Sequence, residues 1–160
     1  MIQRPQTLFL ILTIVMMVLA LVLPNWSKSS KDGTVHAKQT AFSLDITKTV
    51  DNQLVVEPKG RYYIAGTLLL VAGLAGYSIS QFKNRLLQMK LGFGISLGIA
   101  SSLVAMMIGS KEGEQLLEPT VLGVYEIGFY APFIALFSNI ITNRLIRKDE
   151  RLVRSMDRIR

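Results

Sequence analysis

Leu91–Ser110 is a run of twenty residues without a charged side chain, and it limits the possible folds of this chain more than any other stretch. As an α-helix, a run of this length is about 30 Å long, which is the hydrocarbon thickness of a bilayer. Uncharged apolar runs of that length are typical of membrane-spanning helices. The sequence therefore predicts a membrane span at this position.

Three further apolar runs have a comparable length, at residues 7–24, 62–82 and 125–146. Half of the 160 residues are hydrophobic, which is unusual for a soluble domain with a charged surface. Pro24 ends the first run and Trp26 follows shortly after it, which indicates a helix end with an aromatic anchor at the membrane interface, instead of a signal-peptide cleavage site. We expect one membrane domain over residues 1–160, an all-α antiparallel bundle of four transmembrane helices.

Small side chains recur at helical spacings in these runs. They include Gly94, Gly98 and Ser102 in the third run and Gly66 and Gly73 in the second. Such stripes allow close backbone approach between membrane helices, so we expect the two runs to pack against each other. In the fourth run, Asn139 is the most polar interior residue and is expected to form a hydrogen bond between helices.

The segment 25–61 is the one long polar connection between the runs. Its first part is rich in turn-forming residues, whereas residues 41–47 alternate apolar and polar side chains and residues 54–56 form a second β-prone run. We expect either a small β-hairpin over the outer mouth of the bundle or a mobile loop, since a two-stranded hairpin is only marginally stable alone.

Residues that could support catalysis or metal binding are few. The chain has no cysteine, and its one histidine, His36, has no second histidine with which to form a cluster. Glu112, Glu114 and Glu118 lack the spacing of a calcium loop and are expected to lie in a solvated turn or short surface helix. No nucleotide-binding or hydrolase motif is present. We therefore expect neither an enzyme nor a bound cofactor.

The lysines and arginines are unevenly divided between the two sides of the predicted bundle. Eleven lie on the side of the N-terminus, the turn 83–90 and the tail, and seven lie in the two other connections. Cytoplasmic loops of membrane proteins carry the excess of basic residues. The expected location is the bacterial inner membrane, with both termini in the cytoplasm and the segment 25–61 outside.

The tail, residues 147–160, has the pattern of an amphipathic helix. One face carries Leu145 from the end of the last span, followed by Leu152, Met156 and Ile159 in the tail, and a separate face carries Arg147, Arg151, Arg154 and Arg158. It could lie on anionic lipid, dock onto another membrane protein or contact ribosomal RNA, the only nucleic-acid contact that we expect. A basic stop signal that only fixes topology is the simpler interpretation. Together with Lys83, Arg85 and Lys90, the tail forms the predicted docking surface.

Three segments resemble a known family: MIQRPQTLFLIL at the start, QFKNRLLQMKL in the turn between the second and third runs, and RKDERLVRSMDRIR at the end. The chain is similar, along its whole length, to the domain-of-unknown-function 4293 family. The resemblance implies a small four-span inner-membrane protein of Bacteroidota. It implies no activity and no catalytic residues.

The function that these observations favour is a non-catalytic accessory or scaffold subunit of a larger inner-membrane complex, either translocon-like or respiratory. Its expected partners are membrane lipids and other inner-membrane proteins. The alternative is a small transporter or channel, lined by Asn139, Ser138 and backbone exposed at glycines. A transporter usually places an ionisable residue inside a span, and here Glu126 lies only at the border of one.

Overall fold

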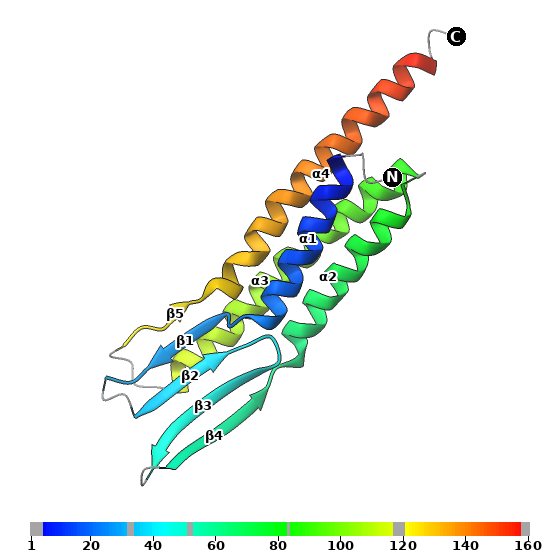
Figure 1. The fold of residues 1–160 in the computed structure, drawn as a ribbon. Helices are drawn as coiled ribbons and strands as arrows, with labels where there is room; N and C mark the ends of the chain where they lie inside the picture. The colour runs from blue at the N-terminus through cyan, green and yellow to red at the C-terminus, as the bar shows by residue number, and fades with distance from the viewer. Residues whose placement is uncertain (1–4, 32–33, 51–52, 83, 117–120, 158–160) are drawn as a thin grey trace.

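The computed structural model describes residues 5–31, 34–50, 53–82, 84–116 and 121–157. Four helices lie side by side, and a β-sheet extends from one end of them (Figure 1). In chain order the elements are α1 (Pro5–Val22), β1 (Trp26–Ser29), β2 (Val35–Gln39), β3 (Ser43–Val50), β4 (Gln53–Gly60), α2 (Tyr62–Ser80), α3 (Arg85–Leu116), β5 (Val124–Tyr125) and α4 (Ile127–Asp157).

The sheet has five strands in the order β4-β3-β2-β1-β5, and every neighbouring pair is antiparallel. The expectation of an all-α bundle with only a small outer hairpin or loop is therefore wrong. The predicted hairpin corresponds to β3 and β4, where Leu44 pairs with Lys59 and Thr47 pairs with Val56. Three more strands continue the sheet from β3 across to the helices.

The strands that the sequence did not predict lack a local β pattern. β1 and β2 read WSKS and VHAKQ, with Val35 as their only β-branched residue. These segments are strands because they pair with other parts of the chain. Trp26, for example, lies opposite both Gln39 of β2 and Tyr125 of β5. Trp26 is only 2% exposed and packs with Ala37 and Leu44, so its predicted role as an interfacial anchor is also wrong.

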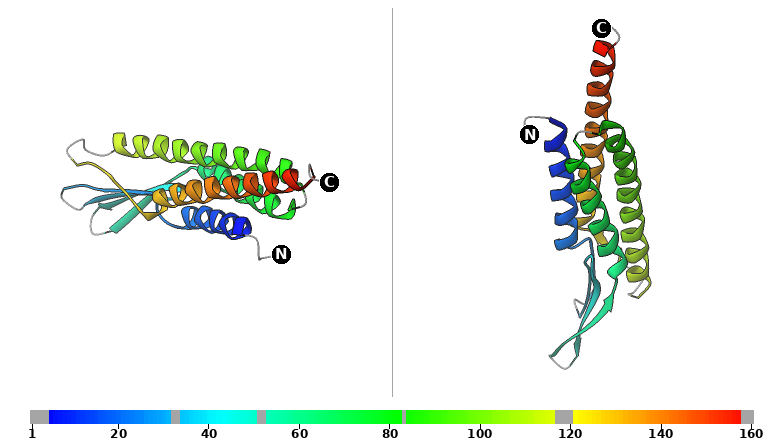
Figure 2. Two further views of the ribbon diagram at one scale, coloured as in Figure 1. Left: turned by 90° about the horizontal axis from the view of Figure 1, so that it is seen from above. Right: turned by 90° about the vertical axis from the view of Figure 1, so that its right-hand side faces the viewer.

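The two longest helices extend beyond the others at opposite ends of the molecule. At helical rise, α1 and α2 are about 27–29 Å long, whereas α3 and α4 are about 46–48 Å long. The last turns of α3 lie beside the sheet, and the last turns of α4 continue past the other helices at the end where the N-terminus lies (Figures 1 and 2). Each long helix is therefore longer than the hydrocarbon core of a bilayer, which is about 30 Å thick, and would extend out of it at one end.

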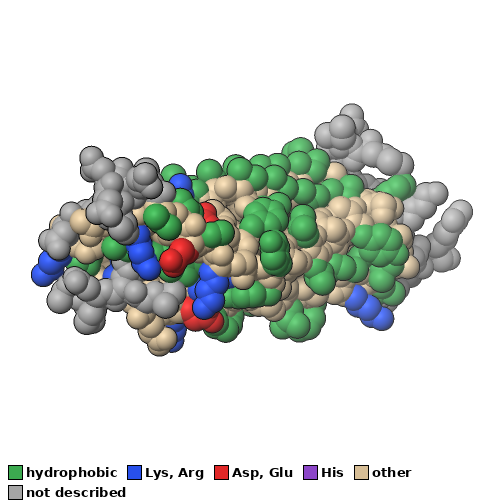
Figure 3. Space-filling model, turned by 90° about the horizontal axis from the view of Figure 1, so that it is seen from below, with side chains coloured by type: hydrophobic (Ala, Val, Ile, Leu, Met, Phe, Trp, Pro, Cys, Tyr) green, Lys and Arg blue, Asp and Glu red, His purple; other side chains and the backbone are tan. Residues whose placement is uncertain are grey.

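The surface of the helices is apolar between two charged ends. All four helices are long and apolar enough to cross a membrane. On the face drawn in Figure 3, the described charged side chains lie over the sheet and at the opposite end, with hydrophobic side chains between them. Large apolar side chains such as Leu69, Leu97 and Phe137 are more than half exposed. An apolar surface of this kind between charged ends is consistent with a membrane protein.

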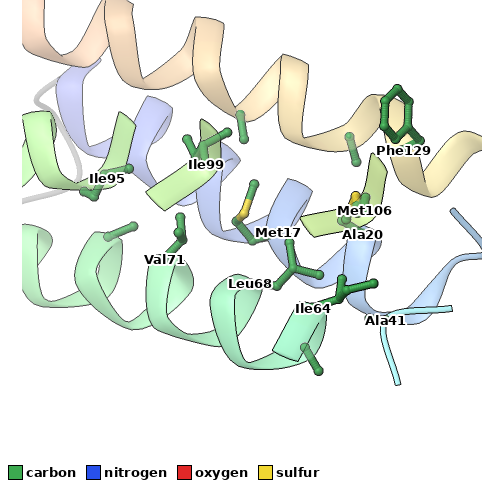
Figure 4. Close-up of a cluster of buried hydrophobic side chains, with 14 of the residues drawn as sticks. Met17, Ala20, Ala41, Ile64, Leu68, Val71, Ile95, Ile99, Met106 and Phe129 are labelled. Atoms are coloured by element: carbon green, nitrogen blue, oxygen red, sulfur yellow. The ribbon is translucent and has the colours of Figure 1, made fainter. Parts of the chain in front are cut away.

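The interior of the helical part is filled by side chains from all four helices. Met17 of α1, Leu68 and Val71 of α2, and Ile99 of α3 are buried and point toward one another (Figure 4). The contribution of α4 to the same cluster is Phe129, Ala131 and Ala135. Neighbouring helices along the chain meet in pairs, and α1 also packs extensively on α4. This closes the four helices into one packed unit.

Only some residues of the predicted small-residue stripes lie at contacts between helices. A Cβ atom added at Gly98 would lie 2.6 Å from Val71 Cγ2, so this glycine lets α2 and α3 approach closely. Ser102 is fully buried on the same helix. In contrast, a Cβ atom added at Gly66, Gly73 or Gly94 would meet nothing within 4 Å. The structure therefore places those three glycines away from the contact between α2 and α3.

Gly98→Ala should lower the free energy of unfolding by about 1–3 kcal/mol, because Val71 is stiff and cannot move aside without straining the core. Thermal unfolding in mild detergent measures the change. Gly94→Ala is the matched control and should be neutral or slightly stabilising, since alanine favours a helix over glycine. Adding Val71→Ala to Gly98→Ala should recover part of the loss. Equal stability of the two single variants would contradict the assigned contact.

Candidate docking surfaces

The junction between the sheet and α3 holds the largest group of buried charged side chains in the described residues. Lys28 of β1 and Arg61, just before α2, have side chains that are 1% and 2% exposed. Lys28 Nζ lies 3.1 Å from Glu114 Oε1, and Arg61 Nη2 lies 2.9 Å from Glu112 Oε2. Both carboxylates come from the last turns of α3. Glu112 and Glu114, predicted to lie in a solvated turn or short surface helix, thus belong to the last turns of the long helix α3 and contact the sheet. Glu118 lies outside the described residues.

Two glycines of α3 create the space for this junction. A Cβ atom at Gly109 would lie 2.6 Å from an Arg61 guanidinium nitrogen, and one at Gly113 would lie 2.7 Å from the Trp26 ring. Gln39 of β2 is fully buried and donates from Nε2 to the backbone carbonyl of Met106, at 3.2 Å. These contacts join β1, β2 and α3. No local sequence pattern indicates these contacts, because the partners lie far apart in the chain.

The charged groups at the junction have a structural role. The two carboxylates are matched by the protein's own cations, and no group of three or more histidine, cysteine, aspartate or glutamate side chains suited to a metal ion occurs within the described ranges. Glu114 also accepts hydrogen bonds from the backbone N–H of Gly123, which leads into β5. Glu114 therefore connects the extended end of α3 to β1 and to the segment just before β5.

The opposite end of the molecule carries the predicted docking surface. Arg85, in the first turn of α3, donates from Nη1 to the backbone carbonyl of Asp149 in α4, at 2.9 Å. This bond joins two basic segments that are 64 residues apart. Lys90 is exposed on α3, and Arg147 is exposed on α4. The structure thus brings the start of α3 and the end of α4 together, and it uses Arg85 to join them.

The last turns of α4 form what we call the basic arm, residues 147–157. Its base lies beside the start of α3, and its far end continues beyond the ends of the other three helices (Figure 2). Arg151 is exposed, and Leu152 is 55% exposed. Arg154 and Met156 lie in the same helix. Of the predicted docking residues, Lys83, Arg158 and Ile159 lie outside the described part of the chain.

Two polar side chains of α4, Asn139 and Ser138, form hydrogen bonds to neighbouring helices. Asn139 is fully buried and donates from Nδ2 to the carbonyl of Gly92 and to Ser96 Oγ, both at 2.8 Å. Ser138 donates to the carbonyl of Phe9 at 2.6 Å, which ties α4 to α1. These are two of the residues that could have lined a transport path. In the structure they connect α4 to its neighbours.

Glu114→Gln should lower the free energy of unfolding by about 1–3 kcal/mol, because it leaves the buried Lys28 ammonium without a charged partner. Thermal unfolding in detergent again provides the measurement. The matched control is Glu57→Gln: Glu57 and Lys48 are 3.5 Å apart but about half exposed, so this change should stay within about 0.5 kcal/mol. A loss no greater than that of the control would contradict the structural role assigned to the junction.

A search of curated proteins found no similar sequence. A family model with the description "Domain of unknown function (DUF4293)" matches residues 2–159, almost the whole chain. This confirms the resemblance predicted from the three sequence segments. The protein therefore belongs to the DUF4293 family.

Proposed function

We propose that this protein is a non-catalytic accessory or scaffold subunit of a larger inner-membrane complex, of a translocon-like or respiratory type. Its docking surface is the basic arm of α4 together with Lys90 at the start of α3. The observation that carries the proposal is the basic arm itself, a helix that continues past every neighbouring helix and exposes both Arg151 and Leu152. A topology signal requires the charge but not this long helical extension.

The polar contacts inside the helical layer support a scaffold more than a transporter. Asn139 and Ser138 donate hydrogen bonds to the backbone of α3 and α1, so their donor groups already serve helix packing. Buried polar groups of a transport path instead have to exchange partners with a solute or with water. A rigid four-helix layer with a sheet on one side and a basic arm on the other is suited to holding partners in place.

The proposed orientation places the basic arm in the cytoplasm and the sheet outside. The two regions lie at opposite ends of the helical layer, so a membrane around that layer separates them (Figure 1). The excess of lysine and arginine at the arm end favours the cytoplasmic side for it. The arm would then meet the anionic lipids and protein partners of the inner leaflet.

Single cysteines test this orientation directly, because the natural chain has none. Ser29→Cys, on β1, should react with a membrane-impermeant maleimide in intact spheroplasts. Ser155→Cys, in the basic arm, should react only after the membrane is permeabilised. Labelling of Ser155→Cys from outside intact spheroplasts would rule out the proposed orientation.

Charge removal in the arm tests the docking role. Arg151→Gln, Arg154→Gln and Arg158→Gln together should release the partner proteins that co-purify with the wild type in mild detergent, because the arm then lacks complementary charge. Membrane insertion should persist, since Lys90, Arg144 and Arg147 remain. A second variant with Leu152→Ser and Met156→Ser removes apolar contact area without changing charge, and it should release partners as well. If both variants keep the wild-type partners, the arm serves topology only.

A further inference from the structure

A pocket of about 240 Å³ lies between α3 and α4, next to the base of the basic arm. One part of its wall is apolar, made by Met89 and Phe93 of α3 and Ile140 of α4. The other part is polar and basic, with Asn143, Arg144 and Arg147 of α4. We call it the α3/α4 pocket. Its wall therefore combines two cations with apolar side chains in a single site.

The pocket lies at the level where both helices change from apolar to basic. In α4, Arg144 is the first charged residue after the seventeen uncharged residues 127–143. In α3, Lys90 is the last charged residue before the uncharged run 91–110. In a membrane this level corresponds to the boundary between the hydrocarbon core and the headgroups, where lipid phosphates lie.

The two arginines are available for an anionic ligand. Both are exposed, and neither belongs to the ion pairs Lys28–Glu114, Lys48–Glu57 and Arg61–Glu112 of the described residues. Guanidinium groups bind phosphate through paired charge-assisted hydrogen bonds, and they are weakly hydrated compared with an ammonium group. Two of them on successive turns of one helix face can hold one phosphate between them.

The apolar wall indicates what is attached to that phosphate. Phe93 is 71% exposed and Ile140 is 37% exposed. Phe93 lies in the uncharged run of α3 and Ile140 in that of α4, so both are on the membrane side of the charged boundary. A free inorganic phosphate would not contact them. A phospholipid would, because its acyl chains run from the phosphate into the hydrocarbon layer.

We propose that the α3/α4 pocket is a binding site for one anionic phospholipid. Arg144 and Arg147 hold its phosphate, and an acyl chain lies on Phe93 and Ile140. The proposal rests on the membrane placement of the proposed function, but not on the existence of a protein partner. It goes beyond general attraction to an anionic leaflet, since it assigns a defined site to two of the basic residues.

Native mass spectrometry and thermal unfolding of the full chain in mild detergent test the proposal. The probes are phosphatidylglycerol and phosphatidylcholine with identical acyl chains. We expect one phosphatidylglycerol to remain bound and to raise the unfolding temperature, with a much smaller effect of phosphatidylcholine. Arg144→Gln with Arg147→Gln should weaken phosphatidylglycerol binding about tenfold or more. Phe93→Ser should weaken binding of the same lipid because it reduces the apolar area that contacts the acyl chain.

Lys148→Gln with Arg151→Gln is the matched control, because it removes the same charge from exposed positions of the same helix that do not line the pocket. If both double variants weaken binding equally, the attraction is diffuse and the proposal fails. If inorganic phosphate alone gives the same stabilisation, the site is for a free anion and the proposal also fails. Unfolding without added lipid checks that each variant is folded. Loss of partner proteins in the arm variants would not change these results, so the two proposals fail separately.

Discussion

The arrangement of this protein depends on the burial of two cations, Lys28 and Arg61, between the sheet and the extended end of α3. Removing an ammonium or guanidinium group from water costs several kcal/mol unless an anion lies close by. Glu112 and Glu114 supply that charge, and they can do so only because α3 continues beyond its uncharged run to Leu116. The length of α3 and the position of the sheet are therefore consequences of the same electrostatic requirement.

The glycines of α3 make this close approach possible. Gly98, Gly109 and Gly113 are separated by eleven and four residues, which places them on nearly one face of the helix. Along that face they meet, in turn, Val71 of α2, then Arg61 with Gln39, and then the ring of Trp26. One helix face thus packs against another helix inside the apolar layer and against the sheet outside it.

The four apolar helices could be predicted from the sequence because length and hydrophobicity are local properties. The sheet could not, since β1 pairs with β5 across about a hundred residues and neither strand has a strong local pattern. Trp26 shows the difficulty: its place after Pro24 is typical of an interfacial anchor, whereas its burial depends on Ala37 and Leu44. Glycine spacing likewise identified Gly98 correctly as a close approach, but it could not exclude Gly66 and Gly73, because spacing does not say which face meets a neighbour. The docking residues were predicted from charge, yet only the structure shows Arg85 bonded to α4.

The direction of the basic arm follows from contacts made below it and at its base. α4 is one helix from Ile127 to Asp157, so any bond that fixes its membrane part also fixes the direction of the arm. Three such bonds are spread along α4: Ser138 to α1, Asn139 to α3, and Arg85 of α3 to the carbonyl of Asp149. A helix of this length is stiff over a few turns, and ordering it in advance lowers the entropy lost when a partner binds. The polar residues inside the helical layer and the basic residues outside it therefore act on one property, the orientation of the proposed docking helix. Packing residues such as Asn139 thus bear on the same proposed function as the arginines of the arm.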